Sequence, residues 1–358
     1  MRPKNLADLR TLLWVAIAVG LVGVQYANFE RAYILPLAIF NFYFALCCGV
    51  IAHNHNHCPV FKDRRLNDTF NNVLSVFYGY PTFVWVPTHN LNHHKHVNRA
   101  GDATITWRYS RKHNALVAAT YFFVSSYWQS FPINTFIAKA KAGNPRLYRK
   151  IITQYAVWLG TWAVLLVGAI YLHGWFWGAV VWGFSVGLPS LFTLWTIMFF
   201  NYEQHVHTDP WSKHNHSRNF ISPFLNYMLF NNGYHGVHHE QPGLHWSKLA
   251  DAHSKIADEI DPALKQRSMF VFMVRQFLLS RFWPQLGTHQ VGRAPYDPPS
   301  GTIGSLDADD CDLGEAGANI GMLAGDAAPP QPSTAEPAKP APATLPLPLE
   351  NDPQRRIA

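Results

Sequence analysis

The chain has 358 residues, of which 48% are hydrophobic and only 14% are Asp, Glu, Lys or Arg. Average soluble domains have about 25% charged residues, and the 13 Trp, 15 Tyr and 24 Phe favour a membrane protein with aromatic side chains at its interfaces. The net charge is +7, but the basic residues are scattered and no recognition motif accompanies them, so we expect no nucleic-acid partner. The four cysteines form no C-x-x-C pair, which argues against a disulfide framework, a zinc knuckle or a fused rubredoxin.

Four apolar runs without Asp, Glu, Lys or Arg dominate the chain after a polar N-terminus, residues 1–10. Each run is near the ~20 residues that a helix needs to cross a bilayer. The runs cover residues 12–28, 32–52, 151–172 and 175–200. Only short turns separate the members of each pair, so the sequence predicts two transmembrane hairpins.

The basic residues predict how these hairpins are oriented. Thirteen Lys and Arg lie in residues 53–150 and twelve lie after residue 201, whereas the two short turns together hold only Arg31. Lys and Arg are enriched in cytoplasmic loops. We therefore expect a multi-pass integral membrane protein with both termini and both long polar regions in the cytoplasm.

Other segments are less regular. Residues 73–87 are apolar but interrupted by prolines and too short to span, and residues 115–138 should lie in the interface or half-enter the membrane. Residues 266–283 are expected to form an amphipathic helix packed on the domain or on lipid. The composition of residues 286–358 predicts a disordered Pro/Ala-rich tail, which leaves residues 11–285 as the membrane domain.

Histidine is overused, with 19 copies, and the first cluster follows the second apolar run directly. If that helix continues past the membrane, His53 and His57 lie on one face, four residues apart. His55 then points away and is excluded as a metal ligand.

The second cluster contains His89, His93, His94 and His96. On an α-helix His89 and His93 share a face, while His94 is turned by about 100°. Such a pair can serve two metal ions, or one ion from two sides. His96 also returns to the first face, and we interpret it as a supporting or surface residue.

Two further clusters lie near the C-terminal side of the fourth run. His205 follows Asn201 by one helical turn, whereas His207 leaves that face. In the last cluster, His235, His238 and His239 fall within about 100° of helical arc and can aim three imidazoles at one point.

All four clusters emerge on the same side of the predicted membrane. Imidazole suits Fe, Zn, Cu and Ni, and shared between two ions the candidate ligands give four or five each, with Asn201 and His96 as possible supporting residues. The candidate ligands are His53, His57, His89, His93, His94, His205, His235, His238 and His239. A metal transporter would place ionisable residues inside its spans, and a metal buffer would need no fixed spacing. Two iron ions held by histidine beside lipid suit oxygen activation against a C–H bond.

This pattern resembles the membrane fatty acid desaturase and hydroxylase superfamily, whose mark is three histidine boxes. The boxes stand here as His53…His57, His89…His93-His94 and His235…His238-His239, and Asn201-x-x-x-His205 is similar to the segment that precedes the last box in acyl desaturases. The resemblance covers roughly residues 12–260. Asn54 departs from it, because Asp or Glu often follows the leading histidine.

The resemblance implies a four-span helical membrane domain under a cytoplasmic helical cap that holds two Fe ions. It also implies O2 as co-substrate, a long-chain lipid lodged in a tunnel, and electrons from a separate ferredoxin, rubredoxin or cytochrome b5. Residues 73–87 and 115–136 are candidates for the tunnel wall.

We therefore expect an all-α oxidoreductase, an oxygen-dependent acyl-lipid desaturase. The alternative is a di-iron hydroxylase, monooxygenase or ketolase of the same superfamily acting on an alkyl, acyl or carotenoid chain. A membrane metal-binding or transport protein is the non-enzymatic alternative.

Overall fold

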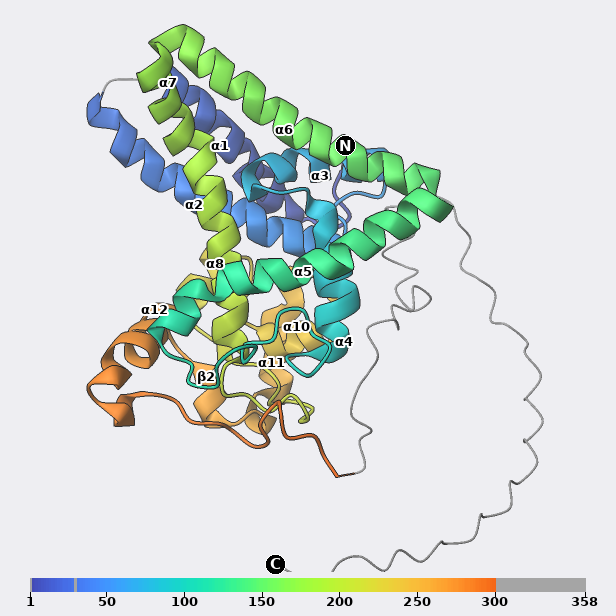
Figure 1. Ribbon diagram of the computed structural model, residues 1–358, viewed down its shortest axis with the longest axis vertical. Coiled ribbons are helices and arrows are strands. Elements are labelled where there is room, and N and C mark those ends of the chain that lie inside the picture. Colours follow the sequence, from blue (N-terminus) through green and yellow to red (C-terminus); the bar gives the residue numbers. More distant parts are fainter. Residues whose placement is uncertain (1, 29–30, 301–358) are drawn as a thin grey trace, which may run out of the picture.

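The computed structural model describes residues 2–28 and 31–300, and this part of the chain is mostly helical (Figure 1). The prediction of an all-α fold needs one small correction. Two short strands, β1 (Asn219–Phe220) and β2 (Lys265–Gln266), pair in parallel. They join the segments before and after the last histidine box.

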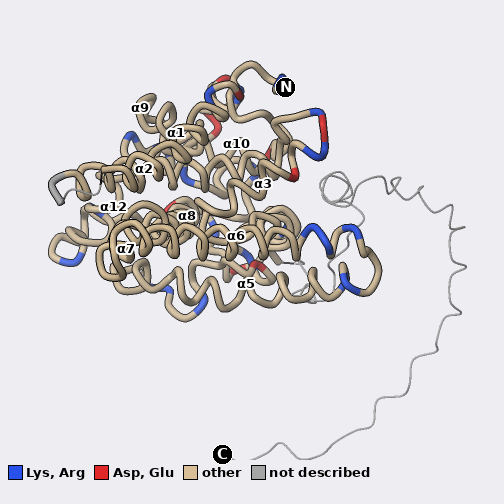
Figure 2. The backbone as a smooth tube through the Cα atoms, turned by 90° about the horizontal axis from the view of Figure 1, so that it is seen from above, with Lys and Arg blue, Asp and Glu red and all other residues tan. Residues whose placement is uncertain are grey.

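Four helices are long and apolar enough to cross a membrane. They are α1 (Asp8–Ala27), α2 (Arg31–His57), α6 (Pro145–His173) and the run of α7 (Trp175–Trp182), η3 (Gly183–Gly187) and α8 (Leu188–His205). Large apolar side chains point outward from them; Val164 on α6, for example, is 72% exposed. Charged residues lie mainly at helix ends and in loops (Figure 2), and the four apolar runs at residues 12–28, 32–52, 151–172 and 175–200 contain none. Such an apolar exterior is typical of a membrane protein.

Two of these helices extend beyond their apolar runs. The second run ends at residue 52, but α2 continues to His57; the fourth ends at residue 200, but α8 continues to His205. Neither extension contains Pro or Gly, so the backbone hydrogen bonds propagate without interruption. The first histidines of the site therefore stand on rigid helical extensions rather than on loops.

The helices α2 and α8 pack directly against each other, and Gly49 permits their close approach. A Cβ atom at Gly49 would lie 2.6 Å from Cγ2 of Thr193. Small residues at such crossings let membrane helices come together. This contact fixes the position of the histidine-bearing ends of the two helices relative to one another.

Helix α3 (Arg64–Tyr78) begins and ends with clear capping signals. The Asp63 carboxylate accepts hydrogen bonds from the backbone N–H groups of Arg65 and Leu66, and Gly79 ends the helix with a φ of +83°. A left-handed residue at this position is most often glycine. The helix packs against α2, α6 and α8.

Helix α5 (Ala115–Gly143) is one continuous helix of 29 residues, although Pro132 lies inside it. It is not among the four candidate spans. In Figure 1 it crosses the molecule below α1, α2, α3 and α6 and above α10, α11 and β2. It packs against α6 and α8.

Residues 82–113 and 201–300, below α5 in Figure 1, are called the head region here. Its elements are short: η1 (Thr82–Val84), η2 (Val86–His93), α4 (His94–His96), α9 (Pro223–Met228), α10 (His235–Glu240), η4 (Trp246–Lys248), α11 (Leu249–Ile256), η5 (Ala257–Glu259), η6 (Pro262–Leu264), α12 (Met269–Met273), η7 (Val274–Leu278), η8 (Leu279–Arg281) and η9 (Pro284–Leu286). The amphipathic helix predicted at residues 266–283 is thus broken, because its backbone changes from α to π to 3-10 hydrogen bonding.

The predicted tail, residues 286–358, is described as far as residue 300, and the rest of it lies outside the described residues. Its described part packs on the segment that follows α8. The Val291 N–H donates to the His207 carbonyl at 3.0 Å, and the Trp211 indole N–H donates to the Ala294 carbonyl at 3.1 Å.

Candidate metal centre

Five imidazoles from three distant parts of the chain meet in what we call the first histidine group. It consists of His53, His57, His89, His94 and His238. The Nε2 atoms of His53, His89 and His238 form a triangle with sides of 2.9, 3.0 and 3.3 Å. Nε2 of His94 lies 3.1 Å from those of both His89 and His238.

Four more imidazoles form the second histidine group, which consists of His93, His205, His235 and His239. Nε2 of His205 lies 3.1 Å from that of His93 and 3.0 Å from that of His235. Nε2 of His239 lies 3.0 Å from that of His235. The structure therefore brings together all nine histidines that the sequence singled out.

A π-helical turn at Val86–His93 distributes the second box between the two groups. In a π-helix each N–H bonds the carbonyl five residues back, and the His94 N–H indeed donates to the His89 carbonyl. His89 and His94 consequently share a face and enter the first group, while His93 enters the second. The His89 and His93 rings do stack on a common face, with centroids 5.2 Å apart, but they enter different groups. The division of the adjacent pair His93 and His94 fits the interpretation that such a pair can serve two metal ions.

The last box is divided in a similar way. On α10, His235 and His239 are one turn apart and both point into the second group, whereas His238 points into the first. The expectation that these three imidazoles aim at one point is therefore corrected. Because η2–α4 and α10 each supply both groups, the two groups lie side by side: the His94 and His239 ring centroids are 4.4 Å apart.

Hydrogen bonding cannot explain this arrangement. Each imidazole nitrogen offers either one N–H or one lone pair, so three mutually close Nε2 atoms such as those of His53, His89 and His238 cannot all be paired. Nε2 of His57 is also buried and has no partner among the described residues. Two nitrogens bound to one ion at about 2.1 Å and about 90° apart lie about 3.0 Å from each other, which matches the observed distances. The donor set therefore fits metal ions.

The protonation state of the head-region histidines is also suited to metal binding. Burial lowers the pKa of their imidazoles well below the usual value, and the neighbouring histidines lower it further. This holds for His89, His94, His235, His238 and His239. These rings are neutral at physiological pH, and the neutral ring is the form that coordinates a metal.

Asp102 orients the ring of His93 in the second histidine group, and sequence reasoning missed this carboxylate. His93 donates its Nδ1–H to the fully buried Asp102 carboxylate at 2.8 Å. Burial alone would raise the pKa of this carboxyl, but His93 and the hydroxyl and N–H of Thr104 outweigh that effect and hold it below its usual range. A carboxylate on the second ring nitrogen fixes the tautomer and leaves Nε2 free for a metal. The only sequence signal was an acidic residue in the polar loop after the second box.

A second missed carboxylate, Asp8, ties the start of the chain to the last box. Its two oxygens accept hydrogen bonds from the indole N–H of Trp246 at 3.0 Å and from Nε2–H of His245 at 3.1 Å. Asp8 is 2% exposed. The contact holds the loop that follows α10 against the first residue of α1.

The remaining histidines lie outside both groups. His55 accepts a hydrogen bond from the Val60 N–H, and His207 contacts the Thr288 hydroxyl. His96 is buried against Gly101. Asn201 donates to the Tyr121 hydroxyl and lines the cavity beside the histidines.

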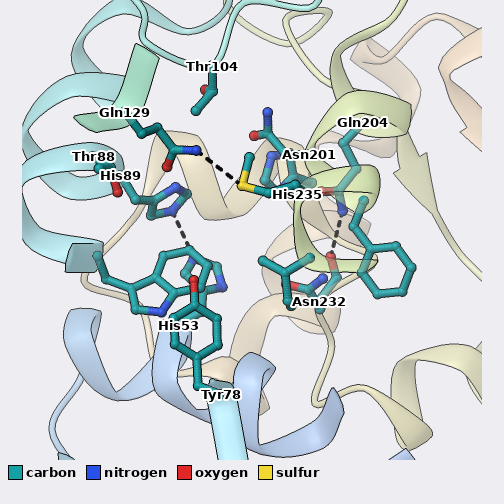
Figure 3. Close-up of a pocket in the computed structure, with 14 residues that line it drawn as sticks. His53, Tyr78, Thr88, His89, Thr104, Gln129, Asn201, Gln204, Asn232 and His235 are labelled. Atoms are coloured by element: carbon teal, nitrogen blue, oxygen red, sulfur yellow. Dashed lines mark hydrogen bonds between the residues drawn. The ribbon is translucent and has the colours of Figure 1, made fainter. Parts of the chain in front are cut away.

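Two cavities lead toward the histidines. The inner cavity, of about 50 Å³, is bordered by His53, His89 and His235 (Figure 3). The outer cavity, of about 340 Å³, lies between α3, α5 and α8 and is mostly apolar. Gln129 and Met198 line both, and Gln129 Nε2 lies 3.4 Å from the Met198 sulfur. Residues 73–87 and 115–136 both contribute to the outer wall.

Comparison with known proteins agrees with this arrangement. The fatty acid desaturase family matches residues 30–271, which include every histidine of both groups. The chain belongs to this family, and its general function is of the desaturase and hydroxylase type. No curated protein and no solved structure gives a match.

Proposed function

We propose that this protein is an oxygen-dependent di-iron desaturase that introduces a double bond into the hydrocarbon chain of a membrane lipid. The observation that carries the proposal is the convergence of nine imidazoles into two adjacent groups with the spacing of metal ligands. Two bound irons would supply the oxidising power against an unactivated C–H bond. The first histidine group would hold one ion and the second group the other.

The chain's own residues bind and orient in this proposal. The Asp102 carboxylate and the carbonyl of His216, which accepts from Nδ1–H of His205 at 3.2 Å, fix two rings of the second group. Most of the site is closed to water, because His93 and His205 are each 1% exposed. A dry, pre-oriented site limits side reactions of O2.

The two cavities support a long apolar substrate. A chain lying in the outer cavity would reach the inner one alongside Gln129 and Met198, which line both, and bring one of its carbons beside His53 and His89. Four apolar helices indicate a membrane protein. We infer from the short turns between the apolar runs that these helices form two hairpins, and from the distribution of Lys and Arg that the head region and both termini face the cytoplasm.

One observation favours a hydroxylase as the second candidate. The inner cavity is lined by the carboxamides of Gln129, Asn201 and Gln204 together with Thr88 and Thr104. Such groups can hydrogen-bond an oxygen that stays on the product. A desaturase has no need to retain such an oxygen.

Iron content tests the metal centre. The purified full chain should hold about two Fe, as two histidine groups of four and five imidazoles imply. His238→Ala removes a ligand of the first group and His239→Ala one of the second, so each should lower the iron content. His207→Ala is the matched control, because His207 lies outside both groups. A wild-type chain that binds no iron under conditions that keep it folded would disprove the proposal.

Product analysis separates the two reactions. The chain is expressed with a ferredoxin and its reductase, and total lipids are examined by mass spectrometry. A lipid that loses two hydrogen atoms indicates desaturation, and one that gains an oxygen atom indicates hydroxylation. The His238→Ala variant should give neither product.

A further inference from the structure

The proposed reaction consumes two electrons in every turnover, and a reductant must deliver them to the histidine groups. In desaturation, one O2, two protons and two electrons are consumed as R–CH2–CH2–R′ becomes R–CH=CH–R′ and two waters form. Hydroxylation takes the same O2, protons and electrons and yields one alcohol and one water. A donor protein must therefore contact the chain, and the inference about where it does so rests on the proposed function.

A basic and aromatic surface of the head region, which we call the Trp107 patch, lies at the point where three segments meet. It consists of Arg99, Trp107, Arg111, Trp211, Arg293 and Tyr296. The guanidinium of Arg99 lies 5.3 Å from the Trp211 ring, and that of Arg111 lies 3.9 Å from the Tyr296 ring. The Trp211 indole N–H donates to the Ala294 carbonyl and so joins these two contacts through the segment that carries Tyr296. The Tyr296 and Trp107 ring centroids are 5.7 Å apart. The described C-terminal segment lies on the side of the molecule away from α6 and α7 (Figure 1).

The charge of this surface is positive. Arg111 and Arg293 are exposed, as is the neighbouring Lys112. Apart from the buried Asp102, Asp209 and Asp297 are the acidic residues of the same segments, whereas Glu240 and Glu259 contact His214, beyond Trp211. The Asp209 carboxylate already accepts hydrogen bonds from the backbone N–H groups of Arg293 and Trp211.

A short buried route leads from the patch to the second histidine group. The Trp107 indole N–H donates to the Asn98 carbonyl at 2.9 Å, and the Asn98 N–H donates to Asp102 at 2.7 Å. Asp102 in turn accepts from Nδ1–H of His93 at 2.8 Å. The Asn98 side chain also donates to the His205 carbonyl at 3.0 Å. Trp107 is thus connected to the His93 imidazole through Asn98 and Asp102, and to the backbone of His205 through Asn98 alone.

We propose that the Trp107 patch is the docking surface for an acidic one-electron carrier protein and that Trp107 is where its electrons enter the chain. Two carrier molecules each lose one electron in a turnover, which supplies the two electrons of the balanced reaction. Complementary charge speeds the encounter of two proteins and makes it dependent on salt. The aromatic rings provide the apolar contact around which the charges are arranged.

Stopped-flow kinetics on the iron-loaded full chain in detergent test this docking surface. The probe is a pre-reduced acidic plant-type [2Fe–2S] ferredoxin, whose oxidation is followed by absorbance without O2. The double variant Arg111→Glu/Arg293→Glu should lower the second-order rate at least about tenfold at low salt, and the difference should shrink as screening increases. The double variant Arg146→Glu/Arg149→Glu is the matched control, because it makes the same charge change at an exposed position at the start of α6.

A second variant separates docking from the electron route. Trp107→Leu should lower the limiting rate at saturating ferredoxin and leave the half-saturating concentration unchanged, whereas the charge variants should do the opposite. Reduction by dithionite should proceed at the wild-type rate in all of them, which shows that the metal centre is intact.

Three outcomes would overturn the inference. One is a patch variant that reacts within about twofold of the control, and another is a wild-type chain that accepts electrons from dithionite but not from the ferredoxin. In both cases the proposed function stands and only the docking surface fails. An iron-loaded chain that dithionite cannot reduce contradicts the proposed function itself.

Discussion

Replacing Asp102 with Asn should weaken metal binding at the second histidine group and leave metal binding at the first group unchanged. Asp102 accepts from Nδ1–H of His93 at 2.8 Å and is fully buried, and its oxygens also accept from the Asn98 and Thr104 N–H groups. An Asn side chain keeps the shape but turns one acceptor into a donor that faces other donors. His93 then loses the charge that fixes its tautomer.

The expected magnitude follows from this one bond. A hydrogen bond to a charged group contributes about 1.5–3 kcal/mol, and about 1.4 kcal/mol corresponds to a tenfold change in an equilibrium constant. Asp102→Asn should therefore weaken iron binding about 10- to 100-fold, the range found for such supporting residues. Because His93 belongs only to the second histidine group, only one of the two ions should be affected.

The assay is a titration of the iron-loaded protein with a competing chelator, with metal measured by mass spectrometry. The variant should lose about one Fe per chain at a chelator concentration that leaves the wild type with about two. Asp68→Asn is the control, because Asp68 forms only a partly exposed ion pair with Lys150, which contributes at most about 1 kcal/mol. Equal loss of both ions from a folded variant, or unchanged affinity, would refute the reasoning.

Three further changes give separate expectations. Gly49→Val places side-chain atoms where a Cβ alone would lie 2.6 Å from Thr193, so α2 and α8 should separate; the melting temperature and the iron content should fall together, and an unchanged iron content would count against the role of this crossing. His55→Ala removes the acceptor for the Val60 N–H and should cost about 1–3 kcal/mol of unfolding free energy with full iron retention, which calorimetry and metal analysis check; loss of iron would instead place His55 in the metal site. Met198→Trp should close the passage between the cavities and reduce product formation at least about tenfold with unchanged iron, and normal turnover by this variant would show that the substrate takes another path.

The sequence predicted most of the fold because the bilayer constrains helix length so strongly. Four runs of apolar residues correspond to the four candidate spans, and the four-residue spacing of His53 and His57 correctly predicted their common face on α2. Hydropathy could not show where a helix ends once it has left the membrane. The extension of α8 to His205 depends on backbone hydrogen bonds that have no apolar signature.

The sequence indicated that His93 and His94 can serve two metal ions, but not which of them shares a group with His89. That choice depends on the π-helical turn at Val86–His93, and a π-turn leaves the residue types unchanged while it shifts the face of every side chain after it. His94 therefore joins His89 instead of standing apart from it. Asp102 was missed for a different reason: it reaches His93 through the fold of a loop, and loops have no period from which a partner can be inferred.

The contact between Asp8 and Trp246 has a consequence for biosynthesis. The two residues are separated by 238 positions, so the loop after the last histidine box cannot dock until nearly the whole membrane domain has left the ribosome. Contacts of such long sequence separation form late, because the chain must lose the entropy of a large loop before they stabilise it. On the proposed function, metal binding should accordingly follow translation, and a nascent chain that stalls before Trp246 would expose an incomplete set of imidazoles to other metal ions.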